Sequence, residues 1–172
     1  MLMRVCWLFI LLLSTSPVMA ADMGITVQIP RIDAAEYHRP YVAVWIEDGN
    51  QAVAANLAVW YQQKDTKEGA GSKWLADLRQ WWRRSGREQS LPIDGVSGAT
   101  RPVGQHQLRF ESGKPPLASL KPGSYQLVVE AVREVGGREL LKIPFDWPIS
   151  ETRHLDAKGQ HELGQITLDL NP

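Results

Sequence analysis

A single hydroxyl group in a run of very small residues has the clearest chemical use in this sequence. Thr100 ends the string Ser-Gly-Ala-Thr, and Asp94 precedes that string. Gly95 and Gly98 relax the backbone, so we expect residues 94–102 to form a short exposed loop. Small neighbours would let the active site of another protein reach the Thr100 hydroxyl. Bulky side chains would block that approach.

This segment resembles the acceptor motif of periplasmic FMN-binding domains. In those domains an ApbE-type flavin transferase takes FMN from FAD and attaches it by a phosphoester to the last Thr or Ser. The resemblance implies that Thr100 carries the FMN, although Arg101 stands where further Thr or Ser residues usually follow. The recognition loop would consist of Asp94, Ser97, Gly98 and Ala99. Such strings also occur by chance in ordinary connecting loops, which is the alternative.

Nearby cationic and aromatic residues are candidates to contact the bound flavin. Arg101 adjoins Thr100, and its guanidinium would favour the negative phosphodiester of FMN. Trp81 or Trp82 would lie beside the isoalloxazine ring, shield it and help set its potential. The alternative is that these tryptophans only pack their helix against the rest of the protein.

Other kinds of chemistry find little support in the sequence. The histidines share no metal-ligand spacing, so no metal site is predicted. Gly-x-Ser-x-Gly, His-Glu-x-x-His and phosphate-binding glycine loops are absent, which leaves a hydrolase without support and identifies no small-molecule substrate. The 19 basic residues match the 19 acidic residues, and this balance disfavours nucleic acid as a partner.

The first 20 residues have the pattern of a secretory signal peptide. Arg4 precedes a short apolar run, and small residues lead up to a predicted cleavage before Ala21. The single cysteine, Cys6, would be removed with this peptide, leaving no thiol for a disulfide or a metal. We therefore expect a periplasmic protein with one immunoglobulin-like domain over residues 21–172.

Alternating apolar residues and turn signals predict a mainly β fold. Seven strands with short turns are typical of an immunoglobulin-like β-sandwich. The expected strands span residues 25–29, 41–47, 53–61, 105–110, 124–132, 139–145 and 164–170. Between the third and fourth strands the apolar period changes, which predicts one amphipathic helix over residues 72–84.

Most of the mature chain is similar to a family of predicted periplasmic proteins, domain of unknown function 2271 (DUF2271). The similar segments are residues 40–48, 60–61, 73–82, 94–102, 122–125, 130–134 and 159–164. Proteins of this family tend to accompany PepSY-type membrane proteins and flavin transferases. The resemblance thus implies an electron-transfer module, a substrate of the transferase and not a catalyst. The alternative function is a non-redox immunoglobulin-like module that binds a partner through a sandwich edge or the Trp/Arg helix.

Overall fold

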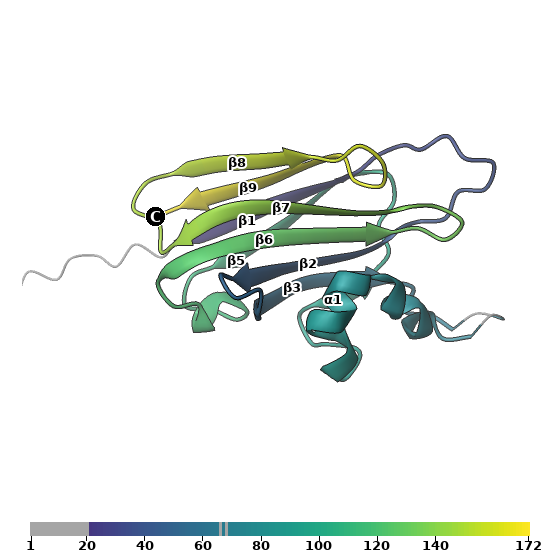
Figure 1. Cartoon of the computed structure of the whole chain (residues 1–172), viewed down its shortest axis with the longest axis horizontal. Helices are drawn as coiled ribbons and strands as arrows, with labels where there is room; N and C mark the ends of the chain where they lie inside the picture. Colours follow the sequence, from purple (N-terminus) through teal and green to yellow (C-terminus); the bar gives the residue numbers. More distant parts are fainter. Residues whose placement is uncertain (1–20, 66, 68) are drawn as a thin grey trace, which may run out of the picture.

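The computed structural model describes residues 21–65, 67 and 69–172, and it contains two packed β-sheets (Figure 1). The predicted signal peptide lies outside the described residues. The four-stranded sheet has the order β5-β1-β9-β8, from β5 (Gly104–Glu111), β1 (Asp22–Ile29), β9 (Gln165–Asn171) and β8 (Arg153–Lys158). The five-stranded sheet has the order β4-β3-β2-β6-β7, from β4 (Ser97–Ala99), β3 (Val53–Tyr61), β2 (Tyr41–Asp48), β6 (Gly123–Val132) and β7 (Arg138–Trp147).

The order in which the chain visits the two sheets is that of an immunoglobulin domain from its second strand onward. Strand β1 crosses to the β2–β3 hairpin, β5 returns beside β1, and the β6–β7 hairpin extends the other sheet beyond β2. The position beside β1 that belongs to the first immunoglobulin strand is filled by β9. The predicted mainly β sandwich with a small helical insertion is therefore confirmed.

The structure has nine strands in its described part, two more than the seven expected. Strand β4 has only three residues and lies in the segment predicted to be a loop. Strand β8 lies in the region expected to be a polar loop, and it pairs with β9 at the edge of its sheet. His154 on β8 bonds Asp169 on β9, and this hydrogen bond raises the pKa of His154.

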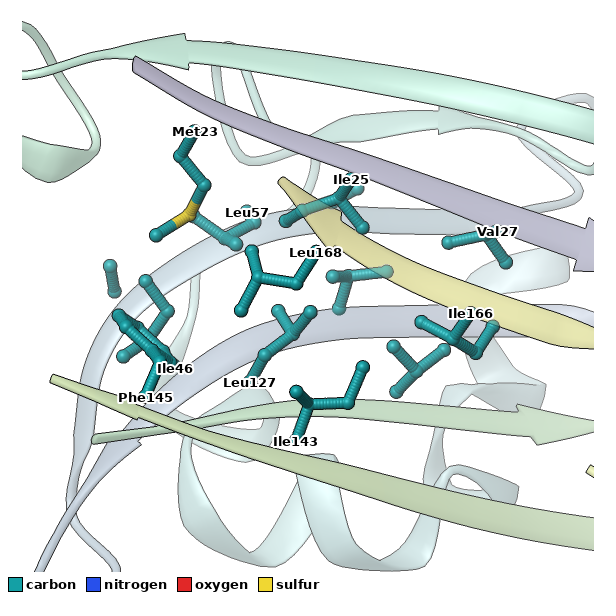
Figure 2. Packing of buried hydrophobic residues seen from close by; sticks show 14 of the residues in the cluster. Met23, Ile25, Val27, Ile46, Leu57, Leu127, Ile143, Phe145, Ile166 and Leu168 are labelled. Carbon is teal, nitrogen blue, oxygen red and sulfur yellow. The ribbon is translucent and has the colours of Figure 1, made fainter. Parts of the chain in front are cut away.

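The main core lies between the two sheets, where alternate residues of each strand point inward. Figure 2 shows Met23, Ile25 and Val27 of β1 and Leu168 of β9 near side chains of the opposite sheet, such as Leu127. The outer face of the four-stranded sheet is polar, with Asp22, Thr26, Gln107, Asp156 and Thr167 among its residues. This alternation is the reason that β1 and β9 follow a strict period of two.

A second apolar cluster covers the outer face of the five-stranded sheet. It joins Trp45 of β2 to Leu75, Leu78 and Trp81 of the helical insertion. Because β2 is buried on both faces, its sequence is a continuous apolar run with no alternation. The insertion consists of 3₁₀ helix η1 (Gly71–Asp77), α1 (Arg79–Arg84) and 3₁₀ helix η2 (Gly86–Glu88).

The prediction of one continuous helix over residues 72–84 is wrong, because the helix breaks at Leu78. The backbone of Leu78 adopts φ −72° and ψ 69°, outside the helical region. The amides of Gln80 and Trp81, at the start of α1, instead donate to the buried carboxylate of Glu130 on β6. A distant carboxylate thus provides the cap for this helix.

Glu139 on β7 orders the turn between β8 and β9. Its carboxylate accepts hydrogen bonds from four consecutive backbone amides, of residues 160–163. Burial alone would raise the pKa of Glu139, but these four donors together lower it below its ordinary value.

We expect Glu139→Gln to lower the free energy of unfolding at neutral pH by about 2 kcal/mol, because the amides lose a charged acceptor. The folded pKa of Glu139 lies below the unfolded value, so this contribution is complete at neutral pH and is lost as the pH falls through the folded pKa. Urea unfolding of the wild type and the variant should therefore converge in acid. The exposed Glu151→Gln is the control, and a difference that persists unchanged in acid would contradict this account.

Candidate functional site at Thr100

The segment that leads to Thr100 is a turn followed by an edge strand, and not the irregular loop that was expected. Gly95, with a φ of +68°, forms the turn, and β4 then pairs in parallel with β3. The Ser97 hydroxyl accepts a hydrogen bond from the Ile93 amide at 2.9 Å, which closes the turn. Asp94 is exposed at its tip. Strand β4 ends at Ala99, so Thr100 directly follows a backbone segment that is held in place by its pairing with β3.

The residues on either side of Thr100 are anchored on Trp60 of β3. A Cβ atom at Gly98 would lie 3.2 Å from Cδ1 of Trp60, so the small residue permits the close approach of β4. On the other side, the Arg101 guanidinium lies 5.3 Å from the centre of the Trp60 ring, as a cation–π contact. His106 packs edge-on against the same ring and bonds the Pro102 carbonyl at 2.7 Å. Arg101 is thus held outside the pocket described next.

Thr100 itself is partly buried and lines a pocket of about 480 Å³. Its hydroxyl makes no hydrogen bond within the described part of the chain. The pocket has aromatic residues from three segments, namely Tyr37, Tyr41 and Trp74. Its charged and titratable residues are His38, Arg39, Asp77, Arg133 and Glu134. A hydroxyl at this position can form an ester with a phosphorylated cofactor, and the aromatic pocket beside it can hold the flat ring of that cofactor.

Tyr41 forms a fixed wall of this pocket. Its hydroxyl donates to the Gly71 carbonyl at 3.2 Å, which joins β2 to the start of η1. Burial raises the pKa of Tyr41, and the carboxylates of Glu134 and Asp77 add to this effect. Tyr41 therefore stays a neutral hydrogen-bond donor at physiological pH.

Arg133 is a buried cation at another wall of the pocket. Its Nε and Nη2 atoms bond the Glu162 carboxylate at 2.9 and 3.2 Å, and the two side chains are only 7% and 4% exposed. Within the described part of the chain, Nη1 of Arg133 and the buried hydroxyl of Tyr37 have no hydrogen-bond partner. A buried donor without a partner costs about 1–3 kcal/mol.

Sequence reasoning missed both Arg133 and Tyr37. The only signal for Arg133 was its position before the Gly136–Gly137 turn. There a Cβ atom at Gly136 would lie 2.6 Å from the guanidinium carbon. Tyr37 lies in the irregular segment between β1 and β2 and had no signal. The Arg133 guanidinium carbon lies 5.9 Å from the centre of the Tyr37 ring, a contact that only the fold creates.

Trp81, one of the two tryptophans predicted as candidates to lie beside a flavin, is fully buried in the structure and does not line the Thr100 pocket. Trp81 is 0% exposed, and its indole N–H donates to Asn56 Oδ1 at 2.9 Å. A Cβ atom at Gly86 would lie 2.5 Å from its ring, which shows how closely the chain encloses it. Trp82 lines a separate hollow with Arg79, Arg83 and Arg138. The tryptophan that lies at the Thr100 pocket is Trp74, which is 47% exposed.

The structure describes residues 21–65, 67 and 69–172, and two features are absent from these ranges. No cluster of three or more His, Asp and Glu side chains there could hold a metal ion. No helix in those ranges has the length and apolar character needed to cross a membrane.

Comparison with family models gave a match over most of the chain. The model of the family described as "Predicted periplasmic protein (DUF2271)" matches residues 22–165, which include the whole Thr100 segment and most of both sheets. The comparisons with curated proteins and with solved structures gave no match.

Proposed function

The chain belongs to the DUF2271 family of predicted periplasmic proteins, and from this premise we propose that it is an electron-transfer module that carries FMN covalently on Thr100. The family supports a periplasmic location. The protein reaches the periplasm through its signal peptide of residues 1–20, which is cleaved before Ala21.

One observation carries this proposal: the Thr100 hydroxyl makes no hydrogen bond to the residues that the structure describes, and it lies at a pocket of a size suited to a cofactor. The pocket of about 480 Å³ falls within the range of small-molecule sites, roughly 300–1,000 Å³. Its aromatic walls suit a flat ring. The enclosed donors of Tyr37 and Arg133, which have no partner among the described residues, suit carbonyl oxygens once the Tyr37 side chain shifts. These residues therefore fit FMN.

An ApbE-type flavin transferase carries out the attachment. The Thr100 hydroxyl oxygen forms a bond to the phosphorus of the FMN half of FAD. The bond from that phosphorus to the bridging oxygen of the AMP half breaks, and AMP leaves. The hydroxyl proton passes to a basic group of the transferase. Asp94, Ser97, Gly98 and Ala99 form the segment that the transferase recognises.

Bound FMN supplies the ability to take up and release electrons, which the side chains of this protein lack. The protein positions the group and limits its contact with water. A PepSY-type membrane protein is the partner that delivers or receives the electrons. Arg101, whose guanidinium lies over Trp60 next to Thr100, holds a positive charge near the phosphodiester.

The test is the intact mass of the mature protein after co-expression with an ApbE-type transferase. We expect the mass to rise by that of FMN less one water, and the yellow colour to stay with the chain after denaturation. Protein expressed without the transferase is the control. An unchanged mass in the presence of an active transferase and FAD would defeat the proposal.

A second candidate function is a non-redox binding module. It is favoured by two exposed apolar side chains at the rim of the pocket, Trp74 at 47% and Val135 at 83% exposure. Exposed apolar residues that gather at one place often mark an interaction site. A colourless protein that still captures a membrane partner would support this function over the first.

A further inference from the structure

Two buried donors without partners lie at the same pocket. Arg133 Nη1 and Tyr37 Oη are the unsatisfied buried side-chain atoms of the described residues, and both residues line the pocket that also contains Thr100. Buried polar groups normally have partners, so a coincidence of two unpaired donors indicates an occupant that accepts hydrogen bonds.

Trp74 gives the same pocket a large aromatic surface. Trp74 stays 47% exposed although the ammonium of Lys73 lies 4.5 Å from its ring centre. An occupant that is flat and aromatic would bury this surface, and stacked rings are favoured over a solvated indole face. The same occupant must therefore combine an aromatic face with carbonyl acceptors at its edge.

We propose that this pocket holds the isoalloxazine ring of the FMN on Thr100, with Trp74 against the ring and with Tyr37 and Arg133 as donors to its carbonyl edge. The inference rests on the proposed function and deepens it, because a covalent flavin could also hang freely in solvent. It moves the aromatic contact from Trp81 and Trp82 to Trp74.

The ring can reach these donors only if Tyr37 moves. Both donor atoms are enclosed, and the Tyr37 ring lies over the Arg133 guanidinium. Residues 30–40, which include Tyr37, form no helix or strand, so this side chain can shift without breaking a sheet. Arg133 itself stays fixed by its paired bonds to Glu162.

The charge of Arg133 favours the reduced state of a ring in this pocket. Reduction adds electron density to the carbonyl edge, and a nearby cation or donor stabilises that density. The Glu162 carboxylate offsets part of this effect, because it is paired with the same guanidinium. Tyr37 and Arg133 are therefore positioning residues that tune the potential.

The experiment uses the flavinylated protein as wild type, Trp74→Leu, Tyr37→Phe and Trp82→Leu, each with its adduct verified by intact mass. We expect wild-type flavin emission to be quenched and to rise on unfolding. Trp74→Leu should lose this quenching, whereas Trp82→Leu should retain it because Trp82 lies in a different hollow. Tyr37→Phe keeps the ring but removes a donor, so the midpoint potential should become more negative.

Two outcomes would overturn the inference while leaving the covalent FMN in place. One is wild-type emission and iodide quenching equal to those of free FMN. The other is an unchanged potential in Tyr37→Phe together with unchanged emission in Trp74→Leu, which would mean that only water occupies the pocket. If no adduct forms, titration of the unmodified protein with free FMN decides. Quenching of FMN emission that is lost in Trp74→Leu would support binding of the ring in this pocket. An absence of FMN binding would refute it.

Discussion

Alanine in place of Thr100 is expected to abolish the proposed FMN adduct completely, because the substitution removes the hydroxyl oxygen that would form the phosphoester. Thr100→Ser keeps a hydroxyl at the same site, now primary instead of secondary, and should still be modified. Intact mass after co-expression with the transferase measures both results. Since the Thr100 hydroxyl makes no hydrogen bond in the described structure and the residue is partly buried, Thr100→Ala should change the free energy of unfolding by no more than about 0.5 kcal/mol.

Ser97→Ala provides the matched control, since it removes a hydroxyl three positions earlier in the same motif. The Ser97 hydroxyl accepts the Ile93 amide, so its loss should lower the free energy of unfolding by about 1 kcal/mol. The FMN adduct should remain, because Thr100 is intact. An adduct that survives Thr100→Ala and disappears in Ser97→Ala would place the modification on Ser97 and contradict its assignment to Thr100.

Trp81→Ala is expected to lower the free energy of unfolding by about 4 kcal/mol, in the range of large aromatic deletions from a core. Trp81 is fully buried between α1 and the five-stranded sheet, and its removal also leaves Asn56 Oδ1 without its donor. This predicted loss is a large part of the free energy of unfolding of an ordinary domain, which is about 5–15 kcal/mol. Urea unfolding measures the effect.

Trp74→Ala is the comparison variant, because Trp74 is half exposed and should cost little stability. Variants at Trp81 are thus expected to affect the stability of the fold, and variants at Trp74 the contact with the flavin. Variants at Trp81 should change the unfolding midpoint and leave the emission of the folded, flavinylated protein unchanged. Equal destabilisation by Trp81→Ala and Trp74→Ala would show that the helical insertion is not packed as described.

The sandwich could be predicted because its strands carry their own patterns. Residues of β1 alternate between core and solvent, and β2 is a β-branched and aromatic run that ends at an Asp-Gly turn. The three-residue β4 could not be found in this way, since it contains no β-branched residue. It forms because the edge of β3 offers partners such as the Val59 amide, which bonds the Val96 carbonyl.

The candidate residue Thr100 could be proposed from a local motif, whereas the pocket beside it could not. Thr100, Tyr37, Trp74 and Arg133 come from four separate segments, and only the packed sheets bring them to one cavity. The burial of Trp81 likewise depends on contacts with distant segments. The periodic pattern indicated a helix face, but it could not show that the Glu130 carboxylate of a distant strand accepts hydrogen bonds from the Gln80 and Trp81 amides at the start of α1.

The pairing of β1 with β9 has a consequence for how quickly this protein acquires its structure. Asp22 lies opposite Asn171, so one ladder joins segments separated by nearly the whole chain. Such non-local ladders are slow to nucleate, and all-β domains of this kind need milliseconds to seconds. Until β9 arrives, β1 presents an open edge to its surroundings, which invites association with other chains. A newly exported molecule is therefore expected to depend on holding chaperones during that interval.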